Sequence, residues 1–139
     1  MIKILICCGA GMSSSFLTQK LQNKCEELGF ADEFSFEFCS IEMLGVKNAV
    51  LKANEYDVVM CCPHLRLFID KVAKTGEVTT PLYILPPQMY GTMVFEEVIQ
   101  DAKDIIEGYK ETKMNPFHFP GEDQPLKIRR SCAYRHLQK

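Results

Sequence analysis

The most constraining feature of this sequence is a fourfold alternation of short apolar runs with longer segments of helical periodicity. The runs are strand-like and lie at 2–7, 34–38, 57–62 and 81–85. Apolar residues recur at helical spacing in the segments that follow them, at 14–28, 41–53, 65–74 and 92–109. Strands that alternate with helices pair in parallel through right-handed crossovers. The pattern therefore predicts an α/β fold, an open four-stranded parallel sheet with helices on both faces.

The helical segments differ in the strength of their signal. The first is followed by Gly29, the expected C-terminal stop. The second has the weakest periodicity, and five of its apolar residues are expected to face inward: Met43, Leu44, Val46, Val50 and Leu51.

Size and cysteine content exclude several classes of protein. The chain has 139 residues, of which 47% are apolar and 24% charged, the balance of one ordinary globular domain. No apolar run reaches the roughly 18 residues that a membrane span needs, and we expect no signal peptide. Seven cysteines without any Cys-x-x-Cys spacing argue against a disulfide framework and a zinc ribbon. We therefore expect reduced thiols, a cytosolic protein and no metal site.

Charge divides the chain into two parts. Residues 1–109 hold nine Lys/Arg and fifteen Asp/Glu, whereas residues 110–139 hold seven and three. The acidic larger part argues against a nucleic-acid partner. We expect a domain at 1–109 and a basic, partly irregular extension at 110–139 that is dispensable for folding. A solvated tail is one interpretation of the extension; contact with a membrane, the acidic domain or a second subunit are others.

The loop after the first strand carries the chemistry. Cys8-Gly9-Ala10-Gly11-Met12-Ser13-Ser14-Ser15 lies where a parallel sheet binds ligands, at the carboxyl end of a strand. Two glycines allow a tight turn with inward N–H groups, and three serines supply hydroxyl donors and a helix cap. This anion cradle also favours a thiolate, so we expect a lowered pKa and a nucleophilic role for Cys8. Because neighbouring strand residues face opposite sides, Cys7 is expected to be buried instead.

This loop has three other interpretations. A Gly-Ser turn with a packed cysteine is common and needs no function. A low-molecular-mass cysteine phosphatase would place an Arg six residues after its Cys, where this chain has Ser14. A Walker loop would need a Lys that is absent.

The segment from Lys3 to Ser15, with its Cys-Gly-Ala-Gly-Met-Ser stretch, resembles the start of lactose/cellobiose-type enzyme IIB proteins of the bacterial sugar phosphotransferase system. Asp57 to His64 and the Tyr90-Gly91 pair match the family in the same order. The resemblance covers roughly residues 1–109. It implies a sheet of strand order 2-1-3-4.

The resemblance also implies a function. Cys8 would accept a phosphoryl group from a phosphohistidine of enzyme IIA and pass it to a sugar bound by the membrane enzyme IIC. Gly9 to Ser15 would bind the phosphoryl group, and no cofactor would be needed. The protein would be cytoplasmic and would associate peripherally with the membrane through enzyme IIC.

The chain departs from the family where Cys62, His64 and Pro86 stand. His64 and Tyr90 are candidates for the rim of the site, although an exposed His without a role is the more ordinary interpretation of His64, and a half-buried core Tyr is an equally ordinary one of Tyr90. Cys61 and Cys62 are expected to pack in the sheet, the alternative being a redox partner for Cys8. Two other functions stay open: a cysteine phosphatase or arsenate-reductase-like enzyme, disfavoured by the missing Arg, and a regulatory IIB-like binding module.

Overall fold

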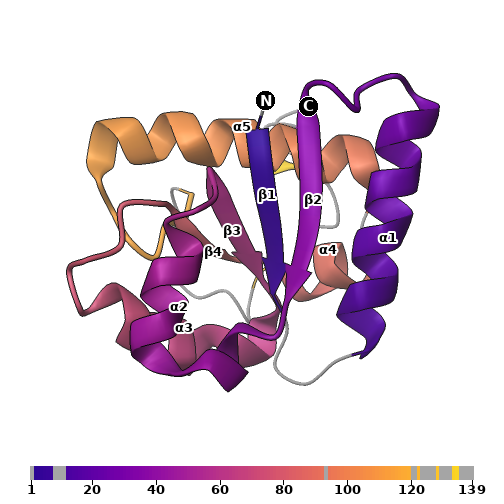
Figure 1. Ribbon diagram of the computed structural model, residues 1–139. Helices are drawn as coiled ribbons and strands as arrows, with labels where there is room; N and C mark the ends of the chain where they lie inside the picture. Colours follow the sequence, from indigo (N-terminus) through magenta and orange to yellow (C-terminus); the bar gives the residue numbers. More distant parts are fainter. Residues whose placement is uncertain are drawn as a thin grey trace.

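The computed structural model describes residues 2–7, 12–92 and 94–119, together with the separate residues 122, 128, 133 and 134. The side chains of 12–17, 42, 43, 64 and 90–92 lie outside this description. Strands and helices alternate along the chain (Figure 1) in the order β1 (Ile2–Cys7), α1 (Met12–Glu27), β2 (Phe34–Cys39), η1 (Ile41–Leu44), α2 (Gly45–Ala53), β3 (Val58–Cys61), η2 (Pro63–Leu65), α3 (Arg66–Ala73), β4 (Leu82–Ile84), α4 (Pro87–Thr92) and α5 (Phe95–Thr112), where η1 and η2 are 3₁₀ helices.

The four strands form one parallel sheet in the order β2-β1-β3-β4, which confirms the predicted fold class and strand order. In the register of the sheet, Ile4 of β1 lies between Phe36 of β2 and Val58 of β3. Because all strands run the same way, their carboxyl ends meet at one edge, and the chain must cross a face of the sheet to begin each new strand.

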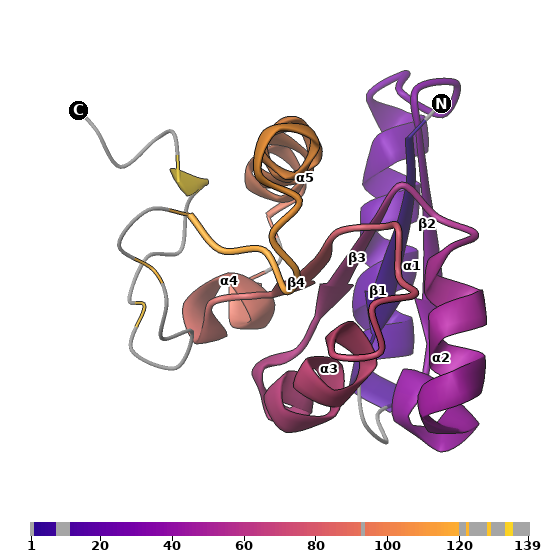
Figure 2. The same ribbon diagram turned by 90° about the vertical axis from the view of Figure 1, so that its left-hand side faces the viewer.

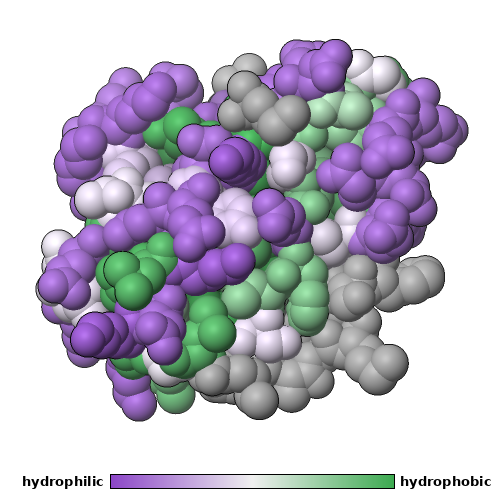
Figure 3. All heavy atoms as spheres, in the orientation of Figure 1, coloured by the Kyte–Doolittle hydropathy of each residue, from purple (hydrophilic) through white to green (hydrophobic). Residues whose placement is uncertain are grey.

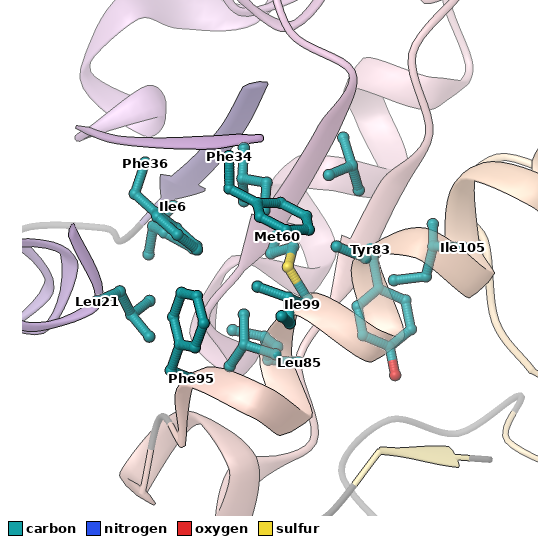
Figure 4. Packing of buried hydrophobic residues seen from close by; sticks show 14 of the residues in the cluster. Ile6, Leu21, Phe34, Phe36, Met60, Tyr83, Leu85, Phe95, Ile99 and Ile105 are labelled. Carbon is teal, nitrogen blue, oxygen red and sulfur yellow. The ribbon is translucent and has the colours of Figure 1, made fainter. Parts of the chain in front are cut away.

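Alternation along the strands builds two cores. Ile4 and Ile6 point to the face covered by α1 and α5, where Leu21 and Phe95 pack against them (Figure 4). The intervening Leu5 and Cys7 point to the face covered by α2 and α3. From Ile4 to Cys7 both faces of β1 are fully buried, which explains why this part of the strand is apolar throughout, whereas Lys3 near its start is exposed.

The second helical segment differs from the prediction. Leu44 and Leu51 were expected to face inward, but they are 37% and 60% exposed. A 3₁₀ turn ends at Leu44 and α2 begins afresh at Gly45, whose φ of 81° is left-handed. This break changes the helical phase, so the buried side of α2 consists of Ala49, Val50 and Ala53, of which Val50 was correctly predicted to face inward. The inward placement of Leu44 and Leu51 is therefore wrong.

The region after β4 also differs. The predicted helix at 92–109 begins later and ends later, as α5 from Phe95 to Thr112. A separate helix, α4, begins at Pro87, which the sequence pattern assigned only to the end of the strand. Proline is favoured in the first turn of a helix because its missing N–H would have no helical partner there, so Pro87 starts α4 rather than merely ending β4.

Residues 113–119, which we call the strap, run along the free edge of β4. Phe117 forms a parallel bridge with Tyr83, and its N–H donates to the Leu82 carbonyl at 2.7 Å. Asn115 binds the same edge, accepting a hydrogen bond from the Leu82 N–H at 2.8 Å and donating to the Thr80 carbonyl at 3.0 Å. The strap thus covers backbone groups that an edge strand would otherwise expose (Figure 2).

The strap also completes the core on the α5 side. Phe117 and Phe119 are buried and meet edge to face at 5.3 Å, and Tyr134 stacks on Phe119 at 4.6 Å. The N–H of Tyr134 donates to the fully buried Asp101 carboxylate on α5 at 2.8 Å. This packing argues against the expectation that everything after Tyr109 is dispensable for folding, because part of the core comes from that segment.

Candidate functional site

The candidate site lies at the edge of the sheet where the parallel strands end. β1, β3 and β4 end at Cys7, Cys61 and Ile84, and the chain then enters α1, η2 and α4. In Figure 1 this edge is at the bottom of the sheet, where the arrowheads of β1 and β2 converge. Ligands of open parallel sheets bind at this edge because helix N-termini and loops gather there.

Cys8, Gly9, Ala10 and Gly11, the core of the predicted phosphate-binding loop, lie outside the described residues. The elements on either side of them are described: the loop leaves β1 at Cys7 and enters α1 at Met12. The predicted strand–loop–helix arrangement is therefore present around the candidate nucleophile, although nothing tests the role of Cys8 itself.

Met12, Ser13, Ser14 and Ser15 belong to the first turn of α1, although the helix was expected to begin near Ser14. The earlier start of α1 is compatible with their predicted role in binding a phosphoryl group. The first four N–H groups of an α-helix have no intrahelical acceptor, and the helix dipole adds partial positive charge at that end. An anion bound after β1 would therefore meet backbone donors from the predicted residues.

Cys7 is fully buried, as the alternation along β1 predicts. Its side chain belongs to the core beneath α2 and α3, and its carbonyl accepts a hydrogen bond from the Cys62 N–H at 3.0 Å. The burial of Cys7 makes it a poor acceptor for a group delivered by another protein.

Further cysteines lie near this edge. Cys61 is the register partner of Cys7 in β3, and Cys39 is its partner in β2. Cys61 and Cys62 are both fully buried in the core beneath α2 and α3, which confirms that they pack within the fold.

Burial changes the acidity of two thiols. Burial raises the pKa of the Cys39 thiol, and the neighbouring Cys7 raises it further. The pKa of Cys25 is raised by burial and, to a smaller extent, by the Glu26 carboxylate. A raised thiol pKa means less thiolate at neutral pH, so neither cysteine is a competing nucleophile.

The two candidate rim residues follow two neighbouring strands at this edge. His64 lies in η2, directly after β3, and Tyr90 lies in α4, after β4. The side chains of both residues are outside the description, so their roles stay predictions. Sequence reasoning missed the helix that carries Tyr90; its only signal was Pro87.

Exposed apolar side chains surround the same edge. Phe38 lies near the end of β2, Leu44 ends η1, and Leu67 lies in the first turn of α3; all three are exposed. Figure 3 shows apolar surface gathered over α2 and α3. Exposed apolar side chains that gather at one edge of a fold favour contact with another protein.

Two further properties concern metals and membranes. Within the described ranges, no group of three His, Cys, Asp or Glu side chains is arranged to hold a metal ion. The helices that the structure describes include none long and apolar enough to span a bilayer.

Comparison with known proteins gives a consistent result. Residues 3–101 match the family model described as "PTS system, Lactose/Cellobiose specific IIB subunit". The chain is 26% identical over 106 residues to the galactose-specific EIIB component of Lactococcus lactis subsp. cremoris (strain MG1363). It is equally similar to the cellobiose-specific EIIB component of Lactococcus lactis subsp. lactis (strain IL1403); each alignment covers 74% of this chain and 94% of the relative.

The matched region contains the whole sheet and the strand–loop–helix around Cys8, and it ends within α5. Three observations point to the same family. They are the parallel sheet of order 2-1-3-4, the loop after β1 whose sequence suits an anion, and the family match over most of the chain. The chain belongs to the lactose/cellobiose-specific IIB family of the sugar phosphotransferase system, and it is a phosphotransferase.

Proposed function

We propose that Cys8 is the phosphorylated residue of this phosphocarrier, with enzyme IIA as donor and a sugar bound by enzyme IIC as acceptor. The observation that supports this assignment most strongly is the position of Cys8 in the chain, one residue after the carboxyl end of β1 and just before the N-terminus of α1. Residues 1–109 would carry this activity, with 110–139 as their extension.

The reaction consists of two balanced displacements. In the first, the Cys8 thiolate attacks phosphorus, so a P–S bond forms as the P–N bond of the donor phosphohistidine breaks. In the second, a sugar hydroxyl attacks phosphorus, the P–S bond breaks to regenerate the Cys8 thiolate, and the hydroxyl proton is released to water. The N-terminus of α1 favours the thiolate before transfer and the phosphoryl oxygens after it.

The backbone N–H groups of Gly9, Ala10 and Gly11 would complete this cradle with the first turn of α1. Dedicated acid–base residues are not needed, because the thiolate is the attacking form from the start. His64 and Tyr90 would stand at the rim of the cradle, where each has hydrogen-bonding capacity toward phosphoryl oxygens.

The partners would dock on the carboxyl edge of the sheet. Phe38, Leu44 and Leu67 offer exposed apolar surface at this edge. Enzymes IIA and IIC would use this edge in turn, because each must bring its reacting group to the same thiolate. The protein would then work in the cytoplasm and join the membrane only through enzyme IIC.

The decisive experiment mixes the full chain with a phosphorylated enzyme IIA and measures intact mass and the site of labelling. Wild type should gain one phosphoryl group on Cys8, and Cys8→Ser should gain none while unfolding like wild type. Cys7→Ser is the matched control. It should accept phosphate but lose about 1–3 kcal/mol of stability, because a hydroxyl replaces a buried thiol.

Label on Cys7, or full labelling of Cys8→Ser, would contradict the assignment. Failure of wild type to accept phosphate from any enzyme IIA would instead favour a regulatory IIB-like module.

A further inference from the structure

A cavity lies on the outer side of β4, between α3 and the strap. Its volume is about 150 Å³. It is lined by Arg66, Asp70, Tyr83, Ile84, Pro116, Phe117, His118, Glu122 and Ile128. Its outer wall comes from residues after 113, beyond the 3–101 that match the IIB family, so this cavity depends on the additional segment of this chain.

The polar groups of the cavity combine one donor with several acceptors. Arg66 and Asp70 stand one helical turn apart on α3. Glu122, which is largely buried and already engaged within the protein, places a second carboxylate in the lining. Arg66 supplies up to five N–H donors, and each carboxylate accepts hydrogen bonds through two oxygens.

His118 contributes a third acceptor. Its Nδ1 lies 3.0 Å from the Phe119 carbonyl oxygen, which only accepts hydrogen bonds. Nδ1 must therefore carry the proton in that bond, which makes Nε2 of the neutral ring an acceptor.

This combination discriminates between classes of ligand. The Asp70 carboxylate repels an anion such as phosphate, and the Arg66 guanidinium one turn away on α3 repels a simple cation such as a diamine. A neutral molecule with several hydroxyl groups suits both kinds of group, because each hydroxyl donates to a carboxylate or to Nε2 and accepts from a guanidinium. Apolar walls from Ile84, Pro116 and Ile128 suit the C–H faces of such a molecule.

Size points to the same class. A cavity of about 150 Å³ is enough for one six-membered ring, as apolar cavities that bind benzene demonstrate. We infer that this cavity binds one neutral monosaccharide or sugar alcohol, and that this binding is independent of Cys8 chemistry.

The test uses isothermal titration of the full chain with glucose, galactose and mannitol, and with inorganic phosphate and putrescine as comparison ligands. At least one neutral polyol should bind saturably, and more tightly than phosphate or putrescine. Asp70→Asn and Arg66→Gln should each weaken that binding about tenfold or more, because each removes charge-assisted hydrogen bonds.

Asp104→Asn is the matched control. Asp104 lies in a different groove, beside α5, so this variant should bind the polyol like wild type. Asp70→Asn should still accept phosphate from enzyme IIA, which separates this inference from the proposed function. The inference is wrong if none of the three polyols binds, if phosphate or putrescine binds better, or if both cavity variants bind like wild type.

Discussion

Removing the Phe117 ring should destabilise the whole domain, although Phe117 lies beyond the region shared with the IIB family. The ring is 6% exposed and belongs to the core on the α5 side, where it meets Phe119 edge to face. Its backbone N–H stays bonded to the Leu82 carbonyl after truncation of the side chain, so Phe117→Ala isolates the contribution of the ring.

The expected loss follows from burial. Replacing a buried Phe by Ala costs about 3–5 kcal/mol, from lost transfer free energy and from the cavity that remains. A domain of this size has a free energy of unfolding of about 5–15 kcal/mol, so the loss is a large share of the total. The melting temperature should fall by roughly 10–15 °C.

Deletion of everything after Thr112 should cost more than Phe117→Ala. It also removes Phe119 and the Asn115 side chain, whose hydrogen bonds satisfy the N–H of Leu82 and the carbonyl of Thr80. The exposed edge of β4 should then favour association between molecules.

The assay is urea and thermal unfolding followed by circular dichroism, with light scattering to detect association. Leu51→Ala is the control, because Leu51 is 60% exposed and its truncation should change stability by less than about 0.5 kcal/mol. If Phe117→Ala unfolds like this control, or if the shortened chain melts within a few degrees of full length, the strap does not stabilise the fold and the reasoning is refuted.

Three further results are expected. Gly108→Ala should destabilise by about 1–3 kcal/mol in urea unfolding, because the new Cβ would lie 2.6 Å from Cζ of the packed Phe117 ring; a gain in stability, as helix propensity alone predicts, would show that the ring moves freely. At neutral pH, iodoacetamide should label Cys8 faster than Cys25 or Cys39, because the pKa values of the latter two thiols are raised and their thiolates form only at higher pH. Peptide mapping measures the order of labelling, and faster labelling of Cys25 or Cys39 would contradict this prediction. Hydrolysis of p-nitrophenyl phosphate should be negligible, since Ser14 stands where a cysteine phosphatase has its Arg; turnover abolished by Cys8→Ala would favour the phosphatase interpretation instead.

The sequence by itself determined the sheet and the location of the site. Continuous apolar runs such as Ile4 to Cys7 have few alternatives to a strand buried on both faces, and their alternation with helices favours parallel pairing. Strand order came from the family resemblance. The predicted burial of Cys7 was also correct, because side-chain alternation is a local property of a strand.

Only the tertiary structure decided where the helices change phase. Leu44 and Leu51 fit an inward stripe when 41–53 is treated as one helix, but the 3₁₀ turn before Gly45 divides it. That division depends on how the chain leaves β2 and packs against α3, which periodicity within the segment does not contain.

The role of the extension was decided in the same way. Phe117, Phe119 and Tyr134 are scattered among prolines and polar residues, so no periodic pattern marks them as core. The buried carboxylate of Asp101, on the apolar side of α5, was the one local sign that a distant segment binds there, and its partner is the Tyr134 N–H. Contacts between residues far apart in sequence arise from the free edge of β4 and the surface of α5, and these exist only once the sheet has formed.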